Sequence, residues 1–147
     1  MAQLNELAKR LIDGKNFASV ATLMPDGSPQ VAPVYVDREG DTIVINAPTE
    51  RQRYHNLKRD PRVALCVYDA QNAFANVMIR GRATEITEVG AWEHVDKLAM
   101  KYTGMKYPRG LKGTMGVESH RAIIRITPDH VTTWTWKIDH EEIQHYH

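Results

Sequence analysis

The stretch INAPTERQRYHNLKRDPRV, residues 45–63, decides how the rest of the chain is interpreted. It begins as the end of a strand. Thr49 then fits a helix N-cap, and Gln52 completes a Thr-x-x-Gln capping box three residues later. The predicted helix runs over 50–59, because Pro61 disfavours helical backbone at the residue before it. A strand that leads directly into a short helix is therefore expected here.

Two arginines, Arg51 and Arg53, lie in the first turn of this predicted helix. Cations there oppose the helix dipole, at about 0.3–1 kcal/mol per charge at exposed sites. A bound anion would remove the conflict, because free backbone N–H groups and two guanidinium groups can converge on it. The alternative is a pair of solvated arginines on an ordinary helix. The pattern predicts either an anion site or a basic surface turn.

The composition is that of one soluble globular domain. The chain has 147 residues, 25% charged and 42% hydrophobic, with a formal net charge of +1. This nearly neutral total argues against general nucleic-acid binding. No apolar run approaches the roughly 20 residues of a membrane span, and the charged N-terminal stretch is unlike a signal peptide. The single cysteine, Cys66, lies in an apolar strand, which predicts a buried thiol in a reducing, cytoplasmic environment.

Helical periodicity is confined to three segments. Leu4, Leu7 and Leu11 share one stripe of a helix over 3–13, and Gly14 follows its end. The second helix is the one over 50–59. Thr87 is expected to cap the third, whose apolar stripe consists of Trp92, Val95, Leu98, Ala99 and Tyr102.

About six short strands in hairpins make up most of the remaining chain. They are expected over 17–23, 30–36, 41–47, 62–68 and 76–86, and over 122–126 and 131–136, which Pro128 separates. The first three would form a meander. Pro33 predicts a sheet edge or bulge, open to a flat ligand, and Gly81 predicts a bulge. Strands and helices do not alternate as they do in βαβ units, so the pattern indicates a mainly β fold, a small antiparallel barrel. The barrel is expected to form one domain over 1–136, followed by a polar tail over 137–147.

Four runs in this order resemble a known family. They are ASVATLMPDGSPQVAPVYV (18–36), DTIVINAPTERQRYHNLKRDPRVAL (41–65), VMIRGRATEI (77–86) and RAIIRITPDHVTTW (121–134). The chain resembles the flavin-binding split-barrel superfamily over roughly 3–136, most specifically in RxRxxNLxxDPRVAL and IRGRAT. That superfamily contains the pyridoxamine 5′-phosphate oxidase-like proteins and the flavin/deazaflavin-dependent oxidoreductases. The resemblance implies a six-stranded antiparallel split β-barrel with a few helices.

The resemblance also implies a homodimer with two cofactor sites at the subunit interface. The arginine pair would hold the cofactor phosphate, the strand over 31–34 would pass under the ring, and the strand end at 46–47 would border the ribityl chain. Residues 76 and 134 would come from the second subunit. The implied cofactor residues are Val31, Ala32, Pro33, Val34, Asn46, Ala47, Arg51, Gln52, Arg53, Asn76 and Trp134. We expect the strand face of Val63, Leu65 and Val67, with the segment 131–136, to supply the apolar dimer surface.

The sequence differs from the pyridoxamine phosphate oxidases at two places that bear on the choice of cofactor. The Arg-x-x-x-x-Lys phosphate strand of the pyridoxamine phosphate oxidases falls on QVAPVY (30–35), without either charge, and the chain ends IDHEEIQHYH rather than in their Arg-x-x-Pro segment. This favours the subgroup that uses the deazaflavin F420 over vitamin B6 oxidation. Between 97 and 117 the charged residues are all basic: Lys97, Lys101, Lys106, Arg109 and Lys112. They are interpreted as contacts for the polyanionic tail of F420 or, alternatively, as a solvated surface loop.

The sequence therefore predicts an oxidoreductase that transfers a hydride from reduced F420 to an unsaturated small molecule, with no nucleic acid or membrane as partner. The alternatives are an FMN-dependent oxidoreductase of the same group and a non-catalytic flavin- or haem-binding module. Tyr35, Tyr68 or water would supply a proton. His94 is expected to be exposed, and His130, His140, His145 and His147 match no common metal-ligand spacing.

Overall fold

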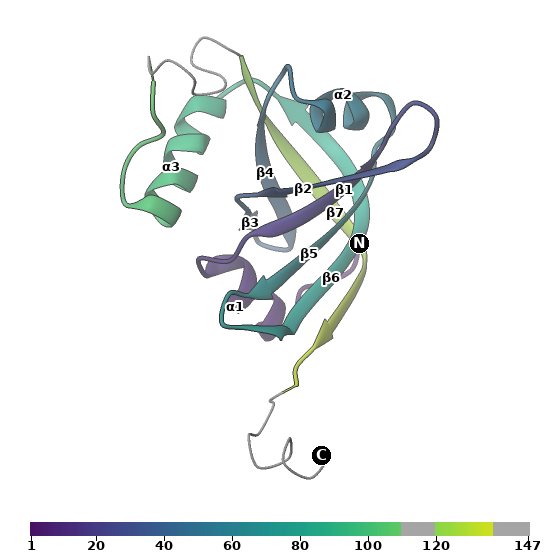
Figure 1. Ribbon diagram of the computed structural model, residues 1–147, viewed down its shortest axis with the longest axis vertical. Coiled ribbons are helices and arrows are strands. Elements are labelled where there is room, and N and C mark those ends of the chain that lie inside the picture. The colour runs from purple at the N-terminus through teal and green to yellow at the C-terminus, as the bar shows by residue number, and fades with distance from the viewer. Residues whose placement is uncertain (110–119, 137–147) are drawn as a thin grey trace, which may run out of the picture.

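The computed structural model describes residues 1–109 and 120–136. Within these residues, seven antiparallel strands form one strongly curved sheet in the order β2-β1-β5-β6-β7-β4-β3, with three helices around it (Figure 1). The elements are α1 (Glu6–Asp13), β1 (Ala18–Leu23), β2 (Pro29–Val34), β3 (Asp37–Glu39), β4 (Thr42–Pro48), α2 (Gln52–Arg59), β5 (Arg62–Asp69), β6 (Asn72–Thr87), α3 (Ala91–Thr103) and β7 (Arg121–Trp134). The mainly β split-barrel prediction is confirmed, with seven strands rather than six.

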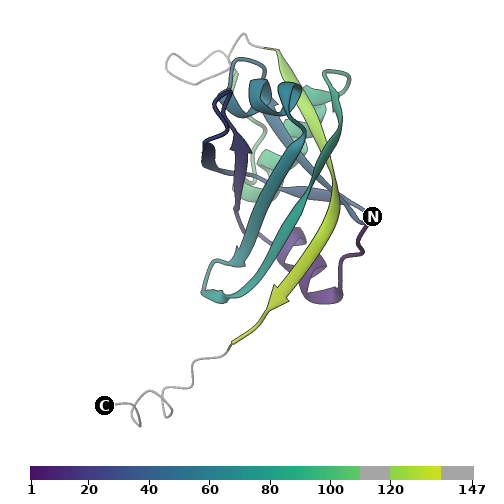
Figure 2. The same cartoon turned by 90° about the vertical axis from the view of Figure 1, so that its right-hand side faces the viewer.

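The hydrophobic core fills the concave side of the sheet. Isoleucines of β4, β6 and β7 are almost fully buried there, and α1 adds Leu11 and Ile12. α1 and α2 lie at opposite ends of the barrel, whereas α3 lies outside it against β4 and β7 (Figures 1 and 2). The space between α3 and the barrel wall is where the candidate site forms.

Strand alternation places β5 differently from the prediction. Val63, Leu65 and Val67 are buried in the core, so they cannot supply the dimer surface. The outward positions are Ala64, Cys66 and the exposed Tyr68. A strand with one face in a core must expose its other residues, so the aliphatic residues that the prediction used face inward, and Ala64, Cys66 and Tyr68 face outward.

The expected capping box of α2 does not form. Thr49 lies in the turn after β4, where its backbone N–H donates to the His120 carbonyl at 2.9 Å, and the N-cap is Arg51. The Gln52 side chain instead donates to Asn56 Oδ1 at 2.9 Å. The Thr87 cap is also wrong: Thr87 ends β6, where it pairs with Ile123, and α3 begins after a left-handed Gly90. In both cases the helix begins two or three residues later than the threonine would allow, because backbone contacts to β7 or to the residue before it engage the threonine.

The strand connections differ from a simple meander. β1 and β2 form a hairpin, but the chain then crosses to the other end of the sheet, where β3 and β4 form a second hairpin. The predicted edge position of Pro33 is confirmed, since β2 ends the sheet. The predicted break at Pro128 is wrong, because β7 runs continuously through it opposite a bulge at Gly81.

Candidate functional site

A cavity of about 270 Å³ lies between the β2 edge, the end of β4, α3 and the start of β7. Its apolar end is lined by Phe17, Pro33, Val34, Tyr35, Val95 and Leu98, and its polar end by Asn46, Arg53, Tyr107 and Arg121. Four of the predicted cofactor residues, at positions 33, 34, 46 and 53, therefore line the same cavity. A cavity with an aromatic end and a cationic end suits a planar ligand that carries an anionic group.

Three arginines gather at the polar end. Arg51 Nε, Arg53 Nε and one terminal nitrogen of Arg121 are buried, and none has a hydrogen-bond partner among the described residues. Burial, and then the positive charges of Arg51 and Arg121, lower the pKa of Arg53 to about 10. Buried donors of like charge without acceptors are unfavourable, and an anion would satisfy them. The cluster therefore has the character of an anion site.

Asn46, at the end of β4, connects these arginines to α3. Its side chain is only 5% exposed. Nδ2 donates to the Ala91 carbonyl at 2.8 Å and lies 3.1 Å from His94 Nδ1, while Oδ1 accepts from Arg121 Nε at 2.7 Å. The Asn46 carbonyl accepts from Arg53 Nη2 at 3.3 Å. One buried residue thus holds two of the three guanidinium groups.

Arg121 is the main residue of the candidate site that the sequence did not indicate. Its guanidinium carbon lies 4.6 Å from the Tyr107 ring centre and 5.6 Å from that of Trp92. It opens β7 directly opposite Pro48, one turn from the arginine pair. Its place at the start of RAIIRIT was visible in the sequence, but the pairing that brings it to α2 was not. Burial lowers the pKa of Arg121, as expected for a desolvated cation.

Stacked aromatic rings form the opposite end of the cavity. Tyr35 and Tyr102 lie parallel, with ring centres 4.2 Å apart and an interplanar angle of 8°. Phe17 lies 5.8 Å from Tyr35 and is half-exposed. The Tyr102 hydroxyl donates to the Asn16 carbonyl at 2.6 Å and accepts from the Val36 N–H at 3.2 Å, which fixes the stack.

The structure does not bring the other predicted cofactor residues to this cavity. Val31 points outward and is 68% exposed, neighbouring Ala32 is half-buried, and the Ala47 side chain is fully buried in the core. Gln52 is bonded to Asn56 instead. Asn76 and Trp134 face each other across β6 and β7, at the far end of the strands from the arginine cluster. Their assignment to a second subunit remains a prediction.

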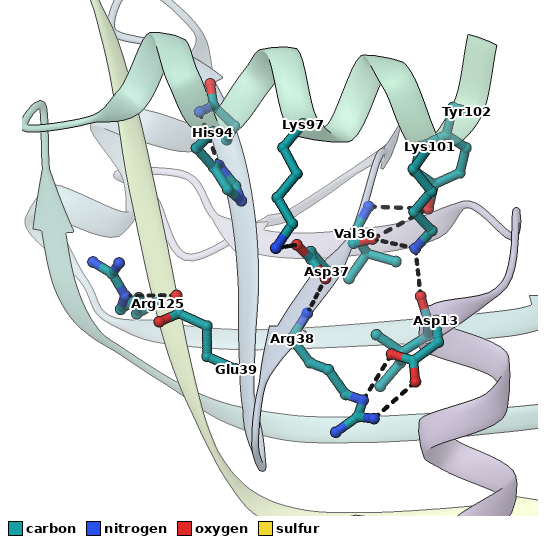
Figure 3. Close-up of polar contacts among 12 residues, drawn as sticks. Asp13, Val36, Asp37, Arg38, Glu39, His94, Lys97, Lys101, Tyr102 and Arg125 are labelled. Atoms are coloured by element: carbon teal, nitrogen blue, oxygen red, sulfur yellow. Dashed lines mark hydrogen bonds and ion pairs between the residues drawn. The ribbon is translucent and has the colours of Figure 1, made fainter. Parts of the chain in front are cut away.

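The basic stretch after residue 97 is largely engaged within the chain, contrary to the expectation of free cations. Lys97 pairs with Asp37 at 3.3 Å, and Lys101 donates to the carbonyls of Ile12 and Val36 at 2.6 and 2.8 Å (Figure 3). Arg109 pairs with Asp96 at 2.8 Å. Lys106 is exposed, and Lys112 lies outside the described residues. Two carboxylates and two backbone carbonyls therefore engage three of the five basic residues of the stretch.

Other expectations concern histidine and cysteine. His94 is half-buried rather than exposed, because α3 packs it against Asn46. Cys66 is half-buried on the outer face of β5, and burial raises the pKa of its thiol.

Within 1–109 and 120–136, no group of three His, Cys, Asp or Glu residues is arranged to hold a metal ion, and no helix is long and apolar enough to cross a membrane. His140, His145, His147 and the rest of the tail over 137–147 lie outside the described residues.

Comparison with known proteins identifies the fold. The model of the pyridoxamine 5′-phosphate oxidase family matches residues 4–135. A solved structure named F420 reductase is 27% identical, covering 88% of this chain and 98% of that chain, with a TM-score of 0.74. A conserved hypothetical protein from Mycobacterium tuberculosis is 23% identical, covering 92% of this chain and 90% of that one, with a TM-score of 0.67.

Another match is more distant. HupZ of Group A Streptococcus is 20% identical over 92% of this chain and 100% of that one, with a TM-score of 0.64. Among curated protein sequences, none is detectably similar to this chain. The family match spans nearly all of the described barrel, and the structural matches share its fold. The chain thus belongs to the pyridoxamine 5′-phosphate oxidase family and has its flavin-binding split-barrel fold.

Proposed function

We propose that the protein is an F420-dependent oxidoreductase that transfers a hydride from the reduced deazaflavin to an unsaturated small molecule, such as an enone, quinone or nitro compound. The observation that carries the proposal is the cluster of Arg51, Arg53 and Arg121, whose buried nitrogens lack acceptors beside a cavity with an aromatic end. The similarity to an F420 reductase supports the choice of cofactor.

The chain's own residues bind and orient the cofactor, which when bound supplies the hydride chemistry. The three arginines would hold its phosphate by charge-assisted hydrogen bonds. β2 pairs with β1 along one side, and its other side has no strand partner within the described residues. Backbone groups on that side are available to bond a ring edge, and Pro33 leaves a position without an N–H donor.

We also propose a homodimer with the cofactor between subunits. The outer face of the sheet carries a second cavity, of about 470 Å³, lined mainly by small and apolar residues that include Ala21, Val31, Ala64, Cys66 and Met78. Asn76 Oδ1 is buried without a partner among the described residues, and Trp134 is half-exposed beside it. A partner subunit would cover the apolar face. Each subunit would then present its Asn76 and Trp134 to the cofactor bound by the other.

The second candidate function is an FMN-dependent oxidoreductase or an FMN carrier. One observation supports FMN as the cofactor: Lys97, Lys101 and Arg109 already have partners in the chain. Fewer free cations then remain for the tail that F420 has and FMN lacks. The arginine cluster itself fits the phosphate of either cofactor.

A pair of fluorescence titrations, with F420 and with FMN, tests the proposal. Replacing Arg53 with alanine should weaken binding of the preferred cofactor about ten- to a hundredfold, because each charge-assisted hydrogen bond contributes roughly 1.5–3 kcal/mol. Arg10→Ala is the matched control, since Arg10 is an exposed arginine on α1 at the other end of the barrel. Equal affinities of Arg53→Ala and Arg10→Ala would contradict the anion site.

Turnover separates the enzyme from a binding module. Reduced F420 is mixed with the protein and a panel of enones, quinones and nitro compounds, and its reoxidation is followed by absorbance. We expect the wild type to turn over steadily and Arg53→Ala to turn over more slowly. Tight binding with no turnover of either reduced cofactor would favour a carrier.

A further inference from the structure

His94 lies on the side of Asn46 that faces away from the arginines. It comes from the first turns of α3, and its Nδ1 is 3.1 Å from Asn46 Nδ2 (Figure 3 shows its position on α3). Through Asn46, the imidazole is connected to Arg121 Nε, because Oδ1 of the same amide accepts from that nitrogen at 2.7 Å. A titratable ring thus lies two hydrogen bonds from the proposed anion site.

The neighbours of Asn46 determine the orientation of its amide. The Ala91 carbonyl can only accept a hydrogen bond, and Arg121 Nε can only donate one. The amide nitrogen must therefore face Ala91 and the amide oxygen must face Arg121. Of the two Nδ2 hydrogens, one is used by Ala91, and the other points to His94. His94 Nδ1 must then be an acceptor, which requires the neutral ring with its proton on Nε2.

Protonation of His94 is incompatible with this arrangement. A protonated ring carries a hydrogen on Nδ1, which would face the N–H of Asn46. Rotating the amide by 180° would remove that conflict, but it would place Nδ2 against Arg121 Nε–H and Oδ1 against the Ala91 carbonyl. No orientation of Asn46 satisfies the protonated ring, Ala91 and Arg121 together.

We propose that His94 is a positioning residue: in its neutral form it holds Asn46, and through Asn46 it holds Arg121, in the orientation that binds the cofactor phosphate. Protonation of His94 releases Arg121 and weakens cofactor binding. The inference rests on the proposed function, because it assigns a control to the same anion site.

Charged groups from three elements surround His94. Asp37 and Glu39 come from β3, Lys97 from α3 and Arg125 from β7 (Figure 3). They are already paired, Asp37 with Lys97 at 3.3 Å and Glu39 with Arg125 at 3.0 Å, so their fields on the ring largely oppose one another. Burial is the largest influence and lowers the pKa of His94, which keeps the ring neutral at neutral pH.

The experiment measures FMN affinity by fluorescence between pH 5 and 8 in four proteins. They are the wild type, His94→Asn, His94→Leu and the control His55→Asn. Asparagine keeps an acceptor near the position of Nδ1 but does not titrate, whereas leucine removes the acceptor. His55 is an exposed histidine on α2. The FMN phosphate itself titrates near pH 6. Affinities are therefore compared as ratios to the wild type at each pH, which removes this common effect.

At pH 8 we expect His94→Asn to bind FMN about as tightly as the wild type and His94→Leu to bind about tenfold more weakly, since one hydrogen bond that orients a charged group is lost. As the pH falls below 6.5 the wild type should lose affinity relative to His94→Asn, reaching about tenfold once the ring is protonated. The His55→Asn profile should follow the wild type. If the affinity of the wild type and that of His94→Asn change with pH in parallel, the inference is overturned. This holds whatever His94→Asn or His94→Leu does to thermal stability.

Nitrogen-15 NMR of the histidine rings gives a second readout that needs no ligand. The signal that disappears in His94→Asn should be that of a neutral ring with its proton on Nε2; a proton on Nδ1 would overturn the inference. If FMN and F420 both fail to bind, the proposed function fails, and the tautomer still decides the His94–Asn46 contact. If FMN binds and requires Arg53 while the two pH profiles stay parallel, only the positioning role fails.

Discussion

Two buried asparagines carry much of the polar organisation at the scale of single residues. Asn46 connects α3 to the arginines, as described above. Asn56, in α2, is fully buried: its Nδ2 donates to Thr22 Oγ1 at 3.0 Å, and its Oδ1 accepts from Gln52 at 2.9 Å. Buried polar groups are stable only when bonded, so these contacts fix how α2 sits on β1.

Replacing Asn56 with alanine should lower the free energy of unfolding by about 1–3 kcal/mol, because Thr22 and Gln52 lose their partner. The measurement is urea denaturation followed by circular dichroism. Gln71→Ala, in the exposed turn between β5 and β6, is the control and should change stability by about 0.5 kcal/mol or less. Similar midpoints for the two variants would show that the Asn56 network contributes little.

His94 should also make stability depend on pH. Its folded-state pKa lies below the ordinary value of 6.5, so the unfolded chain binds the proton more readily. The contribution to stability is therefore fully present above pH 6.5 and is lost as the pH falls below it towards the folded pKa. His94→Asn should show a smaller fall in melting temperature between pH 7.5 and 5 than the wild type. Equal falls would mean that the folded and unfolded pKa values coincide.

At the scale of elements, the pairing of β6 with β7 is the longest in the sheet, and its register shifts at two positions. Gly81 lies opposite Pro128, and the register shifts beside it. A Cβ at Gly81 would lie 2.3 Å from the Thr127 carbonyl oxygen, which is backbone and cannot move aside. The bulge thus lets a continuous strand accommodate a proline that has no N–H to donate.

Gly81→Ala should therefore destabilise the barrel by about 1–3 kcal/mol, the usual range for overpacking against fixed atoms. Gly14→Ala is the matched control: its backbone φ of −73° suits alanine, and the nearest atom to the new Cβ belongs to the Asn16 side chain. Thermal denaturation of both variants checks the prediction. A smaller effect at position 81 than at position 14 would contradict the role of the bulge.

At the scale of the whole molecule, the apolar outer face of the sheet and the cavity beside α3 belong to one proposed dimer. Met78 is 47% exposed on that outer face and lines its cavity. Met78→Glu places a charge in the proposed interface, so light scattering should give about the monomer mass of 16.8 kDa, against twice that mass for the wild type. Cofactor binding should weaken in parallel.

Met100→Glu provides the comparison, because Met100 is 50% exposed on α3, outside that face. It should remain dimeric and keep its cofactor affinity. A monomeric wild type with bound cofactor would rule out a site shared between subunits.

The sequence by itself determined the fold class, the edge position of Pro33, the bulge at Gly81 and the arginine pair at the start of α2. These features depend on local causes: side-chain alternation, the missing N–H of proline and the missing Cβ of glycine. Where local preference met sheet pairing, pairing prevailed. Thr49 and Thr87 are good N-cap residues, yet neither caps a helix. The backbone of Thr49 bonds to His120, and Thr87 pairs with Ile123 of β7.

Only the tertiary structure decided which charges meet. Arg121 is 68 or more positions from the arginine pair in the chain, and it reaches them because β7 pairs with β4 from Pro48 onward. Lys97 and Lys101 form part of a basic run in the sequence, but folding brings them to Asp37 and to backbone carbonyls. Electrostatic energy depends on distance and burial, which strand register and helix packing set and which a linear pattern does not contain.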